Sequence, residues 1–266
     1  MTTTSSQRTS DVNGRLWGAR ARDWAEVQEA QFGGGYDHVL ASASVGPGTR
    51  LLDAGCGAGL AARRAADLGA IIAGIDAAPL LLDIARERCP DGDFREGDLE
   101  ELPHADDSFD VVTGFNAFQF AANPVAALSE ARRVTRPGGI VAVMTWGRPD
   151  GMEAASVVAA LRPLLPAPPP GAPGPFALSD PDRLSGFVAD AGLVPREVIE
   201  GDIFWAYPDE ATALRGLNSS GVAIRAAGLV GEAAVSAAHA AALAPFRQPD
   251  GSFRIGARYM AVLALA

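Results

Sequence analysis

The residues with the clearest chemical potential form a glycine-rich loop at residues 55–59. Gly55-Cys56-Gly57-Ala58-Gly59 follows a short apolar run that ends in Asp53-Ala54. Glycine has no Cβ, so such a loop lets the backbone approach a ligand closely. We expect it to join a strand to a helix, where amide N–H groups and the helix N-terminus can receive an anion. Its G-x-G-x-G spacing differs from the G-x-G-x-x-G of dinucleotide-binding loops.

Acidic residues end or follow the next two strand-like runs. Asp76 closes the run 71–76, at a position where a carboxylate can accept the two hydroxyls of a ribose. Asp98 lies in Gly97-Asp98-Leu99, directly after the weaker run 93–96. In a doubly wound sheet, the first crossover is where such ligands bind. These positions therefore indicate a ligand that carries a nucleoside.

Five motifs in this order resemble the class I S-adenosylmethionine (SAM)-dependent methyltransferases. The resemblance is strongest to their small-molecule branch, which includes enzymes of ubiquinone and menaquinone biosynthesis, and it covers roughly residues 48–147. The motifs are D-A-G-C-G-A-G at 53–59, G-I-D at 74–76, G-D-L at 97–99, F-D-V-V at 109–112 and R-P-G-G at 136–139. None is specific alone, but the five together are.

The resemblance implies SAM as cofactor, S-adenosylhomocysteine as product, and a role for each matching residue. The methionine portion of SAM would lie on the loop, with Asp53 near its ammonium group. Asp76, with Ala77 beside it, would bind the ribose hydroxyls. Asp98 would accept from the adenine amino group, Leu99 would supply its backbone amide, and Asn116 would lie beside the transferable methyl. The loop residues implied are Asp53, Ala54, Gly55, Cys56, Gly57 and Gly59.

Few residues are candidates for acid–base chemistry. Methyl transfer from a sulfonium depends mainly on alignment and water exclusion, and a base is needed only when the acceptor must lose a proton. His38 is the best placed of three histidines, because its helical region forms a lid in the resembling family, although a surface or core position explains it as well. Gln119 could orient a substrate oxygen or cap a helix.

Aromatic and apolar residues indicate how the site is covered. We hypothesise that Trp24 or Tyr36 closes over cofactor or substrate, although packing explains most such aromatics. The segment 152–175 and the helices predicted within 209–244 would form a cap, and its apolar residues favour a small, apolar organic acceptor. A sealed helical subdomain or a homodimer contact explains the same residues.

Composition excludes several function classes. The net charge is −10 and the pI about 4.8, which argues against a nucleic-acid partner. The chain contains no lysine, which rules out Schiff-base lysine chemistry and a P-loop. Two cysteines give no disulfide framework, and the scattered acids do not reach metal-ligand spacing. Without a signal peptide or a long apolar run, we expect a cytoplasmic protein that has no membrane partner.

Alternating strand and helix patterns predict an α/β fold with a Rossmann-like, doubly wound, mostly parallel seven-stranded sheet. Its last strand is antiparallel, and a helical lid and cap complete it. Gly33-Gly34-Gly35 is expected to interrupt the N-terminal helices. The predicted units are a disordered tail (1–10), a helical lid (11–45), the SAM-binding core (46–150), a proline-rich cap segment (151–178), a helix and strand of the core (179–207), a helical cap insertion (208–247) and the final strand (248–266).

Two other functions share much of this pattern. A nicotinamide-dependent oxidoreductase is disfavoured by the glycine spacing and by the absence of a Tyr-x-x-x-Lys pair, which a lysine-free chain cannot have. A protein that keeps the SAM fold for non-methylating chemistry, such as cyclisation, or as a binding module, would carry the same cofactor motifs. Only the acceptor pocket separates that alternative from a methyltransferase.

Overall fold

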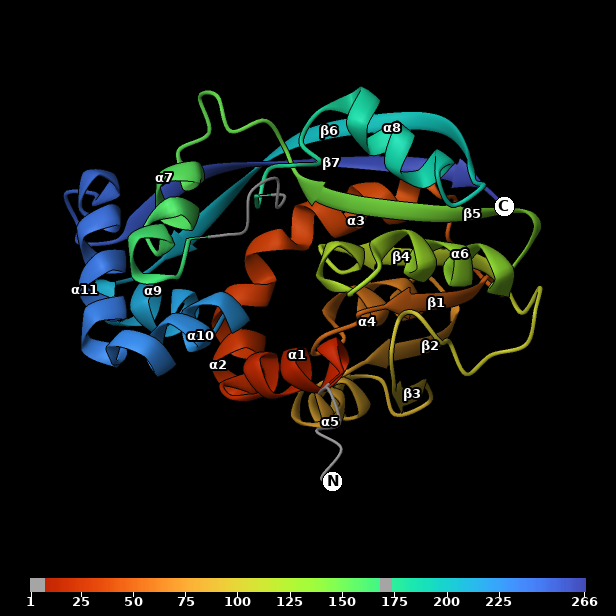
Figure 1. Cartoon of the computed structure of the whole chain (residues 1–266), viewed down its shortest axis with the longest axis horizontal. Coiled ribbons are helices and arrows are strands. Elements are labelled where there is room, and N and C mark those ends of the chain that lie inside the picture. The colour runs from red at the N-terminus through yellow and green to blue at the C-terminus, as the bar shows by residue number, and fades with distance from the viewer. Residues whose placement is uncertain (1–7, 168–173) are drawn as a thin grey trace, which may run out of the picture.

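A seven-stranded sheet crosses the molecule in the order β3-β2-β1-β4-β5-β7-β6 (Figure 1). The computed structural model describes residues 8–167 and 174–266. Neighbouring strands are parallel except that β7 runs antiparallel to both β5 and β6. The strands are β1 Arg50–Ala54, β2 Ile71–Asp76, β3 Asp93–Glu96, β4 Phe109–Phe115, β5 Thr135–Trp146, β6 Val194–Tyr207 and β7 Phe253–Leu265. This topology confirms the predicted fold class.

Helices cover both faces of the sheet, each through a strip of buried apolar side chains. On one face lie α3, α4 and α5, and on the other lie α6 and α8. Asn123 and Asp180 cap α6 and α8 with their side chains, and a proline follows each at the first helical position. The helices of the two faces are α3 Gly33–Ser42, α4 Leu60–Asp67, α5 Pro79–Arg88, α6 Pro124–Val134 and α8 Pro181–Ala189.

The three N-terminal glycines open a helix rather than interrupt one, which corrects the prediction for Gly33-Gly34-Gly35. Helix α3 begins at Gly33, and its first turn packs against other elements. A Cβ at Gly33 would lie 2.4 Å from the Arg64 guanidinium, and one at Gly35 would lie 3.1 Å from Met144 Sδ. Close packing against Met144 and Tyr259, which the local sequence does not reveal, therefore accounts for Gly35, whereas Gly34 has only an ordinary contact with Ile203.

The segment before α3 is a series of short helical turns. They are α1 Thr9–Gly18, α2 Ala21–Asp23, the π-helical turn η1 Trp24–Gln28 and the 3-10 turn η2 Glu29–Phe32. We call residues 8–32 the lid segment. Because α1 begins at Thr9, the tail predicted for 1–10 is wrong at residues 9 and 10; residues 1–7 lie outside the described residues.

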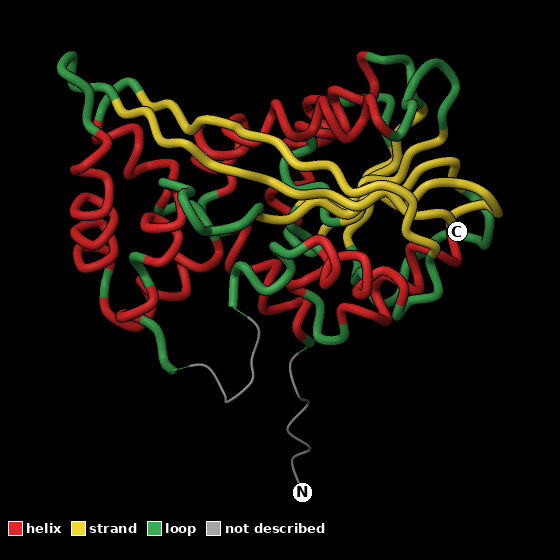
Figure 2. The backbone as a smooth tube through the Cα atoms, turned by 90° about the horizontal axis from the view of Figure 1, so that it is seen from above, coloured by secondary structure: helices red, strands yellow, loops and turns green. Residues whose placement is uncertain are grey.

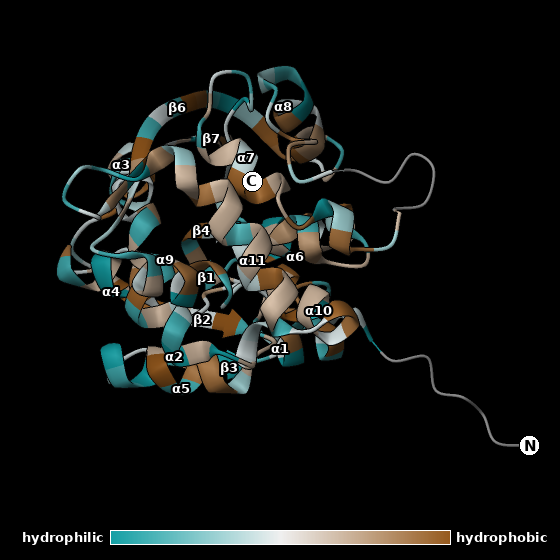
Figure 3. Ribbon diagram, turned by 90° about the vertical axis from the view of Figure 1, so that its left-hand side faces the viewer, coloured by the Kyte–Doolittle hydropathy of each residue, from teal (hydrophilic) through white to brown (hydrophobic). Residues whose placement is uncertain are grey.

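Strands β6 and β7 extend beyond the rest of the sheet as a long two-stranded ribbon (Figure 2). At its far end stand α7 Ala154–Ala159, α9 Glu210–Leu217, α10 Gly221–Val230 and α11 Glu232–Leu243 (Figure 1). We call these four helices the cap. Leu161, Ala223, Ala226 and Val235 form its own small core, and α10 and α11 are largely apolar in hydropathy (Figure 3). Part of the proline-rich segment predicted for 151–178, residues 168–173, lies outside the described residues.

Candidate active site

The glycine loop joins β1 to α4 in left-handed backbone conformations. Gly55, Gly57 and Gly59 have φ values of +76°, +54° and +79°. A Cβ at Gly55 would lie 2.5 Å from Ala117 Cβ, and one at Gly59 would lie 2.8 Å from Ala85 Cβ. Only glycine therefore permits the loop to lie this close to the segment after β4 and to α5.

Side-chain carboxylates already occupy amide groups of this loop. Gly57 N–H donates to Asp76 Oδ2 at 2.9 Å, and Ala78 N–H donates to Asp76 Oδ1 at 2.9 Å. At the start of α4, Leu60 N–H donates to Glu29 Oε1 at 3.4 Å. Two of the amides expected to receive an anion, those of Gly57 and Leu60, thus already pair with acidic groups of the chain itself.

Three buried or half-buried carboxylates meet around the loop, and burial raises the pKa of each of them. For Asp53, which is 2% exposed, the pKa rises to about 7. Loss of hydration is the main cause there, and the charges of Glu29 and Asp76 add to it, while a hydrogen bond from Thr113 opposes it. Burial likewise raises the pKa of Asp76 and of Glu29. A cationic ligand would relieve this repulsion, whereas a pyrophosphate would increase it.

Asn116 and Gln119 lie together where β4 ends. Asn116 has a φ of +51°, an uncommon conformation for a residue with a side chain, and its N–H donates to Met144 O at 2.8 Å. Gln119 Nε2 donates to Asn116 Oδ1 at 3.3 Å. Because Ala117 abuts Gly55, both polar side chains belong to a segment in contact with the glycine loop.

Asp98 and Leu99, the residues predicted to recognise adenine, lie in the turn that follows β3. Asp98 Oδ1 accepts from Glu100 N–H at 3.0 Å and so shapes this turn. Leu99 is half-buried, and its Cδ1 lies 4.0 Å from where a Cβ of Gly55 would be. The structure thus brings Leu99 to the loop.

Helix α1 crosses this edge of the sheet from β2 to β4. Asn13 Nδ2 donates to Phe120 O at 2.9 Å. A Cβ at Gly14 would lie 2.1 Å from the carbonyl oxygen of Ala77, so the two backbones are in direct contact. Further along, Trp24 Nε1 lies 3.7 Å from the position of a Gly57 Cβ. The lid segment therefore covers the loop and the residues that follow Asp76.

Three of the other predicted residues take structural positions. His38 is exposed on α3, and its Nδ1 lies 2.5 Å from the hydroxyl of Tyr259 on β7, which gives no support to a base at the loop. Tyr36 is buried against Phe115 at a ring distance of 4.6 Å, and burial raises the pKa of its hydroxyl. Cys56 is buried with a raised thiol pKa, and its N–H donates to Ile75 O, as expected for a packing residue.

Sequence reasoning missed Glu29. This residue is 3% exposed, and its side chain pairs with Arg88. Ala25, Gln28, Glu29 and Phe32 are buried at helical spacing, so a carboxylate on the apolar face of the lid segment was the available signal. Its partner is 59 residues away in the chain, and no local pattern reveals such a pair.

Aromatic rings continue from the loop toward the cap. Phe32 contacts Trp24, Tyr36, Trp146 and Trp205 at ring distances of 6.4, 6.4, 5.4 and 6.1 Å. Trp146 ends β5, and it also contacts Phe176. Trp205 is 2% exposed, and its indole Nε1 has no hydrogen-bond partner among residues 8–167 and 174–266. We call these rings, with Phe115, the aromatic cluster.

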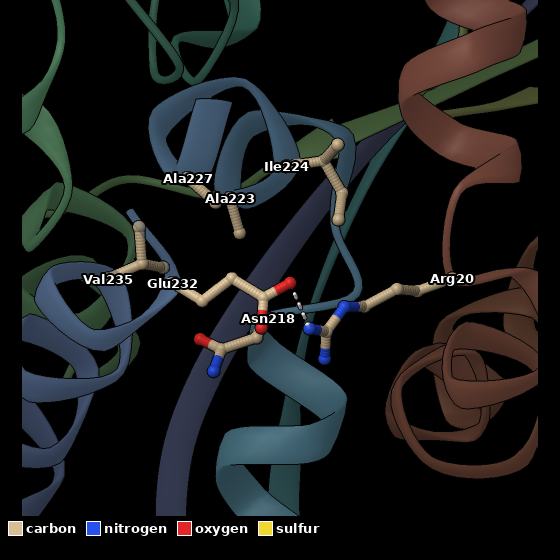
Figure 4. A pocket seen from close by; sticks show the side chains of 7 residues that line it. All are labelled: Arg20, Asn218, Ala223, Ile224, Ala227, Glu232 and Val235. Carbon is tan, nitrogen blue, oxygen red and sulfur yellow. Dashed lines mark ion pairs between the residues drawn. The ribbon is translucent and has the colours of Figure 1, made fainter. Parts of the chain in front are cut away.

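The lid segment also contacts the cap. Arg20 of the lid segment pairs with Glu232 of α11 (Figure 4). Their closest atoms are 2.8 Å apart, and they line a hollow of about 10 Å³, room for one water at most. Arg215 of α9 pairs with Asp23 at 2.5 Å. His239 of the cap is buried, hydrogen-bonded to Asn218, and has a pKa lowered by burial to about 4. The two ion pairs join the lid segment to the cap, whereas His239 is engaged within the cap itself.

The described part of the chain contains neither a metal-binding cluster nor a membrane-spanning helix. In residues 8–167 and 174–266, no three His, Cys, Asp or Glu side chains are arranged to hold a metal ion. Within the same ranges, none of the helices has the length and apolar character needed to cross a membrane.

Comparisons with known proteins agree with this geometry. A methyltransferase-domain family matches residues 52–143. A ubiquinone biosynthesis O-methyltransferase of Cereibacter sphaeroides is 31% identical over 187 residues, which cover 66% of this chain and 74% of that protein. A malonyl-acyl-carrier-protein O-methyltransferase of Serratia marcescens is 38% identical over 109 residues, 41% of this chain and only 43% of that protein. The crystal structure of the cyclase SpnF has the same fold, with a TM-score of 0.54, 21% identity, and 86% and 79% of the two chains covered.

The glycine loop, the carboxylates around it and these relatives together define the protein class. The chain belongs to the class I SAM-dependent methyltransferases, in their small-molecule branch. SAM is the methyl donor for a site of this kind, and its positive charge suits the carboxylates that surround the loop.

Proposed function

We propose that this chain transfers a methyl group from SAM to a small, apolar organic acceptor. The observation that carries the proposal is the group of carboxylates Asp53, Asp76 and Glu29 around a loop whose amides are already occupied. Such a site favours a cation and disfavours the pyrophosphate of a nicotinamide cofactor. When bound, SAM supplies an electrophilic methyl group on a positively charged sulfur.

The residues around the loop would hold and orient the reactants. Asp76 fixes the loop through Gly57 and keeps its carboxylate beside the start of α5. Asp53 would balance the positive charge of the cofactor. Asn116 and Gln119 carry the polar atoms in the segment next to the loop, and we assign them to orienting the acceptor. Alignment and exclusion of water by the aromatic cluster would supply most of the rate enhancement.

The aromatic cluster supports an acceptor with a flat, apolar body. Its rings pack on one another beginning at Trp24 beside the glycine loop, and Trp205 adds one buried donor without a partner in the described chain. Relatives named for ubiquinone biosynthesis and for a malonyl-acyl-carrier-protein acceptor both carry O-methyltransferase names. We therefore place O-methylation first, ahead of N- or C-methylation.

The test combines binding with turnover. Calorimetry should detect SAM and S-adenosylhomocysteine with micromolar affinity and no binding of NADH. Release of S-adenosylhomocysteine should then be measured with phenolic, quinone and amine acceptors. Binding without turnover of any acceptor would favour the cyclase or binding-module alternative, and absence of SAM binding would overturn the proposal altogether.

Substitution of Asp76 adds a second check. Asp76→Ala removes the acceptor for two backbone N–H groups, at a cost of about 1–3 kcal/mol for each unsatisfied donor. We expect cofactor affinity to fall more than 100-fold. The melting temperature should fall as well, because the carboxylate also holds the loop.

A further inference from the structure

The lid segment brings a buried charge onto the glycine loop. One oxygen of Glu29, Oε1, accepts from Leu60 N–H at 3.4 Å and lies 3.5 Å from where a Gly57 Cβ would be. The other oxygen, Oε2, accepts from Arg88 NH1. Glu29 therefore contacts the loop on both sides of Ala58, although it comes from a separate part of the chain.

Arg88, the last residue of α5, holds this arrangement together. Besides Glu29, its guanidinium donates to Ala58 O at 2.9 Å and to Ala25 O at 2.7 Å. Ala25 and Glu29 belong to the lid segment, whereas Ala58 belongs to the loop. A single side chain thus connects lid, loop and α5, and all three contacts exist together only when the lid lies on the loop.

Burial makes this pair sensitive to the position of the lid. The side chain of Glu29 is 4% exposed and that of Arg88 is 24% exposed. Removing one partner of a buried pair leaves an uncompensated charge and commonly costs several kcal/mol. Lifting the lid would hydrate both groups but would also expose Ala25 and the face of the loop, which are buried in the closed arrangement.

We propose that Glu29 is a cofactor-positioning residue, anchored by Arg88, that holds residues 24–32 of the lid segment against the cofactor loop. This inference rests on the proposed function, because it takes SAM as the ligand of the loop. The carboxylate of Glu29 adds negative charge to the loop, and a bound cation in turn favours the arrangement in which Glu29 is in place. Cofactor binding and closure of the lid are therefore coupled.

The experiment measures both ends of this coupling in the full chain. Calorimetry gives the Kd of S-adenosylhomocysteine, and amide hydrogen exchange gives the protection of residues 24–32 with and without it. In the wild type, the ligand should slow exchange in this segment. Glu29→Gln keeps an acceptor for Leu60 but loses the charge, so we expect a Kd at least tenfold higher and little added protection.

Arg22 and Glu87 provide a matched control. They form an ion pair between α2 of the lid segment and α5 with bonds of 2.9 and 2.7 Å, but their side chains are 62% and 56% exposed. Arg22→Met and Glu87→Gln should leave the Kd within twofold of the wild type, because exposed pairs contribute little. If these variants weaken binding as much as Glu29→Gln does, general destabilisation of the lid is the cause and the proposal fails.

The double variant Glu29→Gln/Arg88→Gln guards against misfolding, since it leaves neither charge buried alone. We expect it to fold and still to bind at least tenfold more weakly. The proposal is overturned if Glu29→Gln or the double variant binds S-adenosylhomocysteine within twofold of the wild type. It is also overturned if the ligand leaves hydrogen exchange at residues 24–32 of the wild type unchanged. A wild type that binds neither SAM nor S-adenosylhomocysteine would instead overturn the proposed function itself.

Discussion

The Thr113 hydroxyl donates a hydrogen bond to Asp53 Oδ1 at 2.8 Å, and the two residues are direct partners on the neighbouring strands β4 and β1. This is the stabilising contact that lowers the pKa of Asp53, yet burial and two neighbouring carboxylates still raise that pKa to about 7. Asp53 is therefore held in an unfavourable environment for an ionised group, which is typical of binding sites. Two predictions depend on this residue.

The first concerns stability. An unfolded Asp53 has a pKa near 3.8 and the folded one about 7, so the folded state binds the proton more tightly. Stability from this group is fully present below pH 3.8 and is lost as the pH rises through 7, by at most about 4 kcal/mol. Asp53→Asn cannot ionise and avoids this loss. Its advantage over the wild type in urea unfolding should therefore grow between pH 5 and pH 8; parallel pH profiles would contradict the prediction.

The second concerns cofactor affinity. A cationic cofactor favours ionised Asp53, so binding should release a proton below pH 7. Affinity for SAM should rise about tenfold per pH unit from pH 5 to pH 7 and then level off. Calorimetry in two buffers of different ionisation enthalpy measures the proton release directly. Asp53→Asn should bind more weakly at pH 8 and show a flat profile over the same range.

Two glycines of α1 test whether contact between the lid segment and the core matters for binding. Gly14→Ala would place a Cβ 2.1 Å from Ala77 O, which backbone atoms cannot accommodate, whereas Gly18→Ala meets Ala78 Cβ at an ordinary 3.7 Å. Both changes raise helix propensity by about 1 kcal/mol. We expect Gly14→Ala to raise the Kd of S-adenosylhomocysteine about tenfold. Gly18→Ala is the control and should leave it unchanged, with a slightly higher melting temperature.

Trp205 tests the acceptor side. Trp205→Phe removes an indole N–H that has no partner in the described chain, so the loss of packing is partly offset by removal of a buried unpaired donor. The melting temperature should change by only a few degrees, and the Kd of the cofactor should not change. With an oxygen-bearing acceptor, KM should rise about tenfold. An unchanged KM would show that the ring serves packing alone.

Much of the fold could be predicted from the sequence, because buried parallel strands read as short apolar runs. The runs ending at Ala54, Asp76, Glu96 and Phe115 match β1 to β4. Strand β5 starts at Thr135 opposite Phe109, and its pairing with β4 resumes at Ile140 opposite Val111, so the R-P-G-G segment at 136–139 forms an irregularity within the strand. Proline and glycine had indicated a turn there.

The site was predictable only where its residues are consecutive in sequence. The loop and the acids at strand ends have fixed spacing, so the sequence predicts that Asp53 and Asp76 lie beside the loop, as they do in the structure. Glu29 could not, because its role depends on Arg88 and on how the lid segment folds back. His38 could not be placed from helical spacing either, since the side of α3 that faces Tyr259 is set by tertiary packing. Long-range contacts determine both positions.

The long ribbon of β6 and β7 places the cap at a distance from the strands that carry the glycine loop (Figure 2). The inner half of β7 pairs with β5, whereas the outer halves of β6 and β7 pair only with each other and lie against α7 and α9 of the cap. Substitutions or insertions at the outer end can therefore accumulate without shifting the register of the inner strands. Such an arrangement lets related proteins diverge in the molecules they modify while inheriting one unchanged means of holding the donor.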